Sequence, residues 1–218
     1  LAVEGYPFIL ISILLTIIVW FLYKPALFPV LIWTIFVIAF FRDPERIIPQ
    51  DLQAIVSPAD GRVIIVERYE DGNPPFIPPL AKSPSFPPFT KGDEGGLKGG
   101  MGGFVKVSIF MNVFNVHVNR NPVSGRVVGV FYNPGKFLSA NLDKASLENE
   151  QNVVVVETGD GKRVAFVQIA GLIARRIVCY LKEGDAVERG KRFGMIRFGS
   201  RLDVYLPIEY KIDVKVGD

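Results

Sequence analysis

The chain opens with two long apolar runs, and its pattern of hydrophobic and polar positions changes sharply after them. Across residues 6–41 the only charged residue is Lys24, which separates apolar runs at 6–23 and 26–41. Runs of this length without polar periodicity predict helices that face lipid. We therefore expect residues 1–46 to form a helical hairpin that spans or dips into a bilayer and anchors the rest of the chain.

Two basic residues, Arg42 and Arg46, come directly after the second apolar run. Basic residues that flank a membrane segment favour the cytoplasmic side. The expected location is the cell membrane, with the following domain on the cytoplasmic side.

After residue 46, short β-branched runs alternate with turn residues, which is the pattern of strands. The runs that we expect to be strands are 54–56, 62–68, 104–111, 113–118, 125–132, 152–157, 163–170, 176–181, 193–198 and 203–206. One short helical window lies near 138–149. The fold class is therefore expected to be mainly β (α+β), with the hairpin followed by a compact antiparallel β-domain over 47–218.

Within that domain, residues 70–103 are rich in proline and glycine and lack hydrophobic periodicity. Such a composition buries too little apolar surface to offset the entropy of ordering the chain. We expect a flexible loop between two strands.

A Gly-Asp turn at 184–190 resembles the turn of biotinyl/lipoyl half-barrels, and residues 214–218 begin a second copy of it. Half-barrel elements are therefore expected in the β-domain. A carrier domain would also present a lysine on a hairpin tip, but Lys144 lies in a window that favours a helix or a loop.

Charge and composition exclude several functions. The net charge of +3 comes from 25 basic and 22 acidic residues, a balance too even for a nucleic-acid-binding protein. The chain has one cysteine, Cys179, and one histidine, His117. These numbers exclude an intrachain disulfide, a thiolate metal site and a multi-histidine centre, so no metal is expected.

Gly199 and Ser200 lie between two β-rich runs and carry a specific chemical possibility. The Ser200 hydroxyl can attack the Gly199 carbonyl, because glycine has no side chain to hinder the approach. The resulting ester can eliminate, break the chain and leave dehydroalanine at position 200, which hydrolyses to a pyruvoyl group. A ketone formed in this way can act as a carbonyl cofactor.

Several ordered motifs accompany this pair, and with them the chain resembles the short, membrane-anchored, pyruvoyl-dependent branch of the phosphatidylserine decarboxylase family. The motifs are Phe40-Phe41-Arg42-Asp43-Pro44, Ser57-Pro58-Ala59-Asp60-Gly61, the stretch 114–125, Asn149-Glu150, Ile169-Ala170-Gly171 and the stretch from 194 onward.

The resemblance implies a proenzyme that cleaves itself between Gly199 and Ser200. The products would be a large chain, 1–199, and a small chain, 200–218, that stay together as a heterodimer. The pyruvoyl cofactor formed from Ser200 would convert phosphatidylserine to phosphatidylethanolamine and CO2 through a Schiff base. The implied partner is a phospholipid substrate in the membrane, and no nucleic-acid partner is implied. Whether the protein also forms a homo-oligomer stays open.

The resemblance also implies roles for Asp60 and His117. Asp60 would orient or deprotonate the groups that drive self-cleavage, and the His117 imidazole suits proton transfer near neutral pH. Longer members of the family carry a second histidine three residues after the first, where this chain has Arg120. Their Asp–His–Ser triad therefore cannot be transferred, and either His117 takes the second histidine's role or it is shared between Asp60 and solvent.

Three arginines, Arg120, Arg197 and Arg201, are candidates to bind the substrate phosphate or carboxylate, because a guanidinium group matches the geometry of both anions. Exposed arginines at strand ends are the competing interpretation. Two other functions remain open from the sequence. One is a membrane-tethered half-barrel carrier or binding module without catalysis, and the other is a decarboxylase of another serine-headed lipid, such as an archaeal ether lipid.

Overall fold

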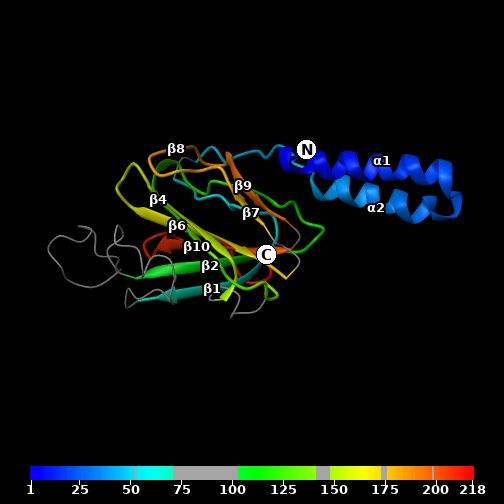
Figure 1. Ribbon diagram of the computed structural model, residues 1–218. Helices are drawn as coiled ribbons and strands as arrows, with labels where there is room; N and C mark the ends of the chain where they lie inside the picture. The colour runs from blue at the N-terminus through cyan, green and yellow to red at the C-terminus, as the bar shows by residue number, and fades with distance from the viewer. Residues whose placement is uncertain (52, 71–102, 141–147, 173–175, 198) are drawn as a thin grey trace.

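A computed structural model describes residues 1–51, 53–70, 103–140, 148–172, 176–197 and 199–218 of the chain. Two N-terminal helices project from a domain built of antiparallel strands (Figure 1). The expected mainly β (α+β) class is confirmed at this level. Nearly all of the flexible loop expected at 70–103, and the centre of the helical window at 138–149, lie outside the described residues.

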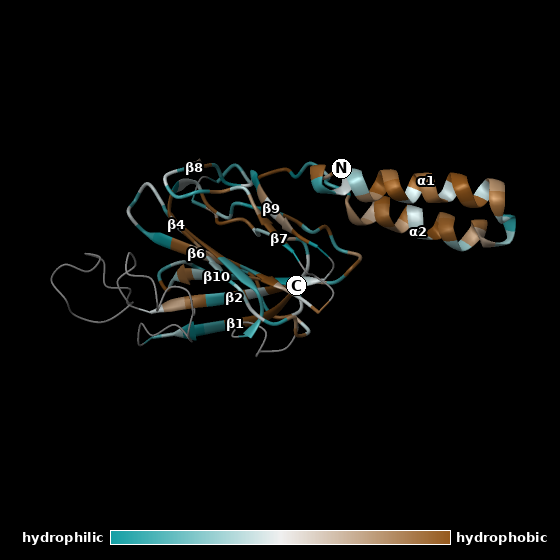
Figure 2. Ribbon diagram, viewed as in Figure 1, coloured by the Kyte–Doolittle hydropathy of each residue, from teal (hydrophilic) through white to brown (hydrophobic). Residues whose placement is uncertain are grey.

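The helices agree closely with the two apolar runs. Helix α1 covers Tyr6–Leu22 and α2 covers Leu27–Phe40, and short 3-10 turns η1 (Val3–Gly5) and η2 (Lys24–Ala26) precede them. The hairpin is largely hydrophobic, as its brown colour in Figure 2 shows, and most of its apolar side chains are exposed. Val3–Leu22 is long and apolar enough to cross a membrane, whereas the second helix is shorter.

A small polar cluster joins the two helices. The hydroxyl groups of Thr16 and Thr34 are 2.8 Å apart, and the Thr34 hydroxyl also donates to the carbonyls of Ser12 and Val30. Each hydroxyl thus finds a partner within the hairpin, which matters where no water is available to supply one.

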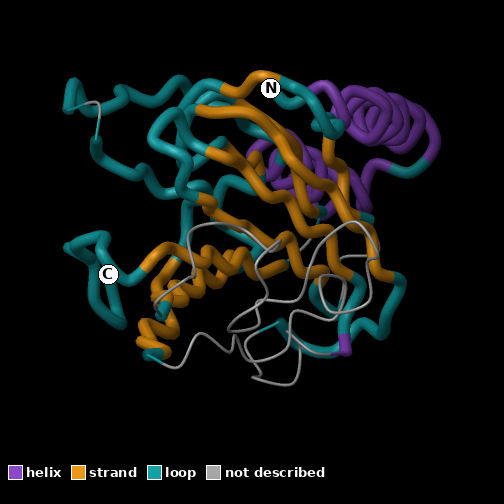
Figure 3. The backbone as a smooth tube through the Cα atoms, turned by 90° about the vertical axis from the view of Figure 1, so that its left-hand side faces the viewer, coloured by secondary structure: helices purple, strands orange, loops and turns teal. Residues whose placement is uncertain are grey.

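The described strands form two antiparallel sheets, which Figure 3 shows together with the helices seen end-on. The larger sheet has the order β1-β2-β10-β6-β5-β4-β8, and the smaller has the order β3-β9-β7. Their bounds are β1 Arg62–Tyr69, β2 Phe104–Met111, β3 Val118–Arg120, β4 Gly125–Asn133, β5 Gln151–Glu157, β6 Arg163–Ala170, β7 Ile177–Cys179, β8 Ala186–Val187, β9 Arg192–Ile196 and β10 Ser200–Pro207.

Two expected strands are wrong, and one begins earlier than expected. Residues 54–56 form no strand, and 113–118 is mostly a turn. In that turn the Asn112 side chain accepts from the Phe114 N–H, while the Asn115 side chain accepts from the Asn112 N–H. Asparagine side chains that bond to nearby backbone in this way compete with strand pairing. Strand β10 begins at Ser200 and not at 203.

The main hydrophobic core lies between the two sheets. Phe193 and Ile196 of β9 pack with Phe166, Leu202 and Val204 of the larger sheet, and all five side chains are buried. Most of the side chains that the strands contribute to this core are valine, isoleucine or phenylalanine, because these positions are shielded from water.

Strand β10 occupies a central position in the larger sheet. Ser200 pairs with Met111 of β2 on one side and with Ala170 of β6 on the other. The Gly199–Ser200 bond therefore lies where a tight turn enters the middle of the sheet.

Candidate active site

The candidate cleavage site is a turn whose backbone conformation requires glycine. Gly199 has φ +74°, a left-handed value that strains any residue with a β-carbon. The next residue, Ser200, is completely buried, and its hydroxyl lies 3.9 Å from the sulfur of Met111. A serine hydroxyl is thus held in a water-poor environment directly after a peptide carbonyl that carries no neighbouring side chain.

His117 contacts the backbone of this turn, although it lies 82 residues away in the chain. The Gly199 N–H donates to Nε2 of His117 at 3.1 Å, and Nδ1 lies 3.0 Å from the Asn115 carbonyl. Because a carbonyl only accepts, Nδ1 carries the proton and Nε2 presents its lone pair. The turn at 112–115 and the start of β3 position the ring.

The surroundings of His117 keep the ring neutral. The pKa of His117 is lowered to about 4, chiefly by burial and to a smaller extent by Arg42, while the Asn115 carbonyl opposes the shift. The Phe40 ring at the end of α2 lies 4.5 Å from the imidazole, centre to centre. At neutral pH the ring is therefore an uncharged base, which can accept a proton without first having to lose one.

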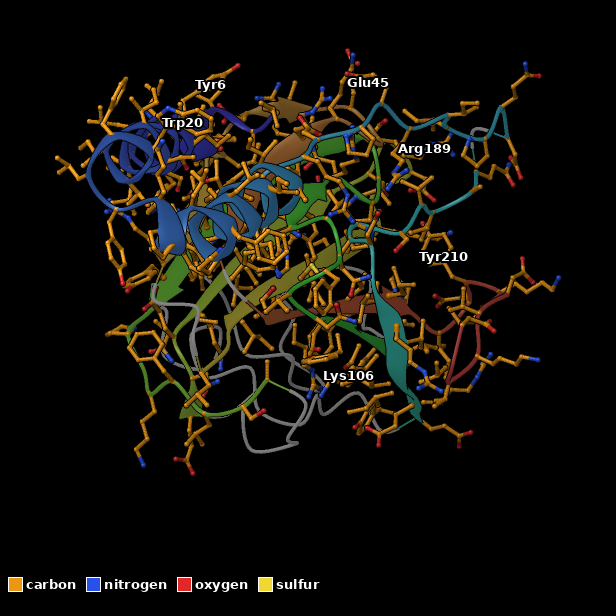
Figure 4. The ribbon with its side chains drawn as sticks, turned by 90° about the vertical axis from the view of Figure 1, so that its right-hand side faces the viewer. Tyr6, Trp20, Glu45, Lys106, Arg189 and Tyr210 are labelled. Carbon is orange, nitrogen blue, oxygen red and sulfur yellow. The ribbon has the colours of Figure 1, made fainter. Side chains whose placement is uncertain are left out.

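The foot of the hairpin forms one wall of this site. Phe40 and Phe41 are fully buried, and Arg42 donates from its side chain to the carbonyls of Ala39 and Phe114. Figure 4 looks at the molecule from the hairpin side, with Tyr6 and Trp20 on the helix and Glu45 on the segment that follows α2. The site thus lies at the end of the domain from which the helices project.

The structure does not bring Asp60 to His117. Asp60 is partly exposed and pairs with Arg46, and no hydrogen bond or ion pair joins it to His117 in the described part of the chain. Asp60, Arg46 and Arg120 line a hollow of about 360 Å³. Any action of Asp60 on the imidazole therefore requires a rearrangement or passes through its neighbours.

Two of the three candidate arginines are engaged with carboxylates. Arg120 donates to Asp43 at 3.1 Å and to the Pro44 carbonyl at 2.9 Å, and so ties the segment after α2 to β3. Arg201 is fully buried and makes a two-point contact with Asp203, at 2.6 and 3.2 Å. Both guanidinium groups serve the framework around the site in this uncut chain.

Arg197 differs from the other two arginines. Its guanidinium lies 5.2 Å from the centre of the Phe8 ring in α1, and its Nε atom is buried without a hydrogen-bond partner among the described residues. Burial lowers the pKa of Arg197, and the neighbouring Arg176 lowers it further. Two cations therefore lie close together near the foot of the hairpin, an arrangement that favours an anion between them.

The sequence alone gives no role to Asn149 and Gly171, two residues near the Gly199–Ser200 bond, although both lie in motifs that carry the resemblance. A β-carbon at Gly171 would lie 2.2 Å from the Gly199 carbonyl oxygen. The buried Asn149 side chain donates to the Ala170 carbonyl at 2.7 Å. Close backbone approach of this kind leaves no signal in hydrophobic periodicity.

Comparison with known proteins gives a consistent result. The family model for phosphatidylserine decarboxylase matches residues 33–218. The chain is 50% identical to the phosphatidylserine decarboxylase proenzyme of Syntrophus aciditrophicus strain SB, over 100% of this chain and 92% of the relative. It is 49% identical to that of Geotalea uraniireducens strain Rf4, over 100% and 91%, and 43% identical to that of Neisseria gonorrhoeae strain NCCP11945, over 100% and 74%.

Proposed function

Since the chain belongs to the phosphatidylserine decarboxylase family, we propose that it cleaves itself at Gly199–Ser200 and then decarboxylates phosphatidylserine to phosphatidylethanolamine. The observation that carries this proposal is the contact of the His117 lone pair with the backbone of a left-handed glycine, directly before a buried serine. A neutral base, a nucleophilic hydroxyl and an unhindered carbonyl are the three groups that self-cleavage needs.

The cleavage chemistry balances within the chain and one water molecule. The Ser200 hydroxyl attacks the Gly199 carbonyl carbon, the peptide C–N bond breaks, and the hydroxyl proton ends on the freed nitrogen. A base then removes the Ser200 α-proton, the Cβ–Oγ bond breaks, and Gly199 leaves as a carboxylate. The dehydroalanine tautomerises and reacts with water, which releases ammonia and leaves the pyruvoyl group.

His117 is proposed as the base that accepts the Ser200 hydroxyl proton. Its Nε2 lone pair already lies at the scissile turn, and its low pKa keeps it unprotonated. The Nδ1–H···O=C bond to Asn115 holds the ring in this tautomer. A small shift of the turn would exchange the Gly199 N–H for the serine hydroxyl.

The residues around Ser200 suit a pyruvoyl group. That group supplies a carbonyl that condenses with the substrate amine and takes up the electrons released as CO2 leaves. The chain's own task is to hold this position between β2 and β6, to exclude water with Met111 and Phe40, and to return a proton through His117.

The two products of cleavage are proposed to stay together as a heterodimer of 1–199 and 200–218. Strand β10 pairs along its length with β2, from Ser200 to Pro207, and also with β6. Loss of one peptide bond at its first residue leaves these ladders and the core contacts of Leu202 and Val204 intact.

Residues 1–46 are proposed to anchor the protein in the cell membrane, with the β-domain, 47–218, on the cytoplasmic side. The exposed apolar surface of the hairpin and its internally satisfied hydroxyl groups support an environment of lipid. Half-barrel elements within 47–218 are supported by the left-handed glycines of the repeated turn, Gly184 at φ +94° and Gly217 at φ +105°.

Arg197 is proposed to bind the substrate phosphate, because its buried Nε has no hydrogen-bond partner in the described part of the chain and it lies at the foot of the hairpin beside Phe8. A phospholipid headgroup that enters from the bilayer would meet this position. Arg120 and Arg201 are proposed to act indirectly, by holding Asp43 and Asp203.

Intact-mass spectrometry and a CO2-release assay test the proposal. Wild-type protein should contain two chains with a pyruvoyl end at position 200 and should release CO2 from phosphatidylserine vesicles. Ser200→Ala should give one inactive chain. A wild-type protein that stays uncut yet is fully active would contradict the mechanism, and an uncut protein without activity would support a carrier or binding module.

A further inference from the structure

Two segments that belong to no assigned part of the mechanism meet at the scissile bond. They are Asn149-Glu150, directly before β5, and Ala170-Gly171, where β6 ends at Ala170. The register of the sheet places Ala170 directly opposite Ser200. The residue after Ala170 therefore lies against the residue before Ser200, which is Gly199.

Gly171 lies in close contact with the Gly199 carbonyl, the group that the Ser200 hydroxyl is proposed to attack. An added β-carbon at Gly171 would lie 2.2 Å from the Gly199 oxygen and 3.0 Å from its carbonyl carbon. By contrast, a β-carbon at Gly199 itself would meet nothing within 4 Å. The space at Gly171 is thus occupied by the scissile carbonyl, and any larger residue there would displace it.

Asn149 holds the backbone on which Gly171 depends. This fully buried amide donates to the carbonyls of Ala170, at 2.7 Å, and Leu138, at 2.8 Å, and its oxygen accepts from the Leu138 N–H at 2.9 Å. The Ala170 N–H in turn donates to the Glu150 carbonyl at 3.0 Å. The two bonds to Leu138 fix the amide, and the amide and the Glu150 carbonyl together hold both backbone polar groups of Ala170, directly before Gly171.

We propose that Asn149 and Gly171 are positioning residues for self-cleavage, which hold the Gly199 carbonyl in the orientation that the Ser200 hydroxyl attacks. This inference rests on the proposed self-cleavage and adds to it two residues that position the scissile carbonyl. His117 acts on the nucleophile, whereas Asn149 and Gly171 act on the electrophile. Attack requires a defined approach of oxygen to the carbonyl carbon, and a displacement of about 1 Å can cost on the order of 100-fold in rate.

The first test is Gly171→Ala in the full chain, with cleavage followed by intact mass after synthesis in a cell-free system with lipid vesicles. The rate should fall on the order of 100-fold. Gly159→Ala is the matched control, because a β-carbon there meets nothing within 4 Å, and it should cleave like the wild type. Cleavage of Gly171→Ala at the wild-type rate would overturn the proposal.

Hydroxylamine separates an impaired attack by Ser200 from a slow elimination after the attack. It cuts the ester formed by attack of Ser200 but leaves an ordinary peptide bond intact. Uncut Gly171→Ala protein should resist hydroxylamine, because the attack itself is impaired. If hydroxylamine cuts it, the attack has occurred, only the elimination is slow, and the proposal is wrong.

Asn149→Asp is the second variant and decides the question if Gly171→Ala does not fold. The carboxylate keeps the shape of the amide but no longer donates to Ala170. Asn152→Asp is its control, because Asn152 is a buried amide three residues further along the chain, in β5, that donates to Gln168 and not to Ala170. Cleavage should slow much more in Asn149→Asp than in Asn152→Asp, while CO2 release per cleaved chain stays near that of the wild type.

Equal slowing in the two asparagine variants would overturn the proposal, since a loss of stability would then explain both. These results are distinct from a failure of the proposed function. That failure would appear in the wild type itself, as an uncut active chain or a cut at another bond.

Discussion

His117 should titrate far below an ordinary imidazole, with a pKa of about 4 against 6.5. Burial beside Phe40 removes water from the ring, and Arg42 disfavours a second positive charge nearby. The suitable sample is the uncut Ser200→Ala protein in detergent, because it is homogeneous and retains the Gly199 N–H that donates to Nε2.

This shift couples the protonation of His117 to folding. As the pH falls, the unfolded chain binds the proton first, near pH 6.5, and the folded protein binds it only near about pH 4. Stability is therefore lost as the pH falls from about 6.5 to about 4 and is independent of this group above that window. The difference of about 2.5 units corresponds to about 3 kcal/mol, of which about 2 kcal/mol are lost by about pH 5.

A direct assay is available because His117 is the only histidine of the chain. Selective 15N-histidine labelling gives the signals of one imidazole, which report both the midpoint and the tautomer. We expect a midpoint near 4 and a proton on Nδ1 between about pH 5 and about pH 8. Urea unfolding of the protein with and without His117→Gln should show that the variant lacks this acid-dependent loss of stability.

Two outcomes would refute this reasoning. A midpoint near 6.5 would mean that water reaches the ring, and that the site is not the dry environment derived from burial. A proton on Nε2 would mean that the ring donates at the scissile turn, so it could not accept the serine proton without first changing tautomer.

Three other features have measurable consequences. Arg201→Met removes the two-point partner of the buried Asp203 carboxylate and leaves it only Lys106, at 3.5 Å, so calorimetry should show a loss of about 3 kcal/mol, the lower end of the range for a broken buried pair. Because Asp60 pairs with Arg46, Asp60→Asn and Arg46→Met should slow gel-assayed cleavage equally and combine less than additively. If the two losses in cleavage rate are fully additive, Asp60 and Arg46 act independently and this prediction is wrong. The protein should stay with membranes through a carbonate wash, and release by salt alone would contradict the anchor.

Local composition was sufficient to predict several features. An apolar run broken only by Lys24 has few structural options, and the two helices follow it within a few residues. Strands such as β6 follow the predicted range because β-branched runs flanked by turn residues favour extended chain. The reactivity of a Gly-Ser peptide bond makes Gly199 and Ser200 candidate site residues, and His117 is a candidate because it is the only imidazole of the chain.

Residues 113–118 show where this reasoning fails. Their β-branched residues favour a strand, but the side chains of Asn112 and Asn115 bond to nearby backbone and form a turn. The same turn gives the Asn115 carbonyl its place at Nδ1 of His117. Competition between side-chain and inter-strand hydrogen bonds is settled by which partner strand is within reach, and a single segment does not contain that information.

Only the tertiary structure decided which residues meet at the site. His117 reaches Gly199 across 82 residues, Asp60 pairs with Arg46, and Gly171 lies against the Gly199 carbonyl. The two contacts of Gly199 depend on the register of β10 between β2 and β6 and on the packing of the smaller sheet. Hydrophobic pattern determines which face of a strand is buried, whereas register is a property of strand pairs, and a shift of one residue would turn Ser200 away from Met111.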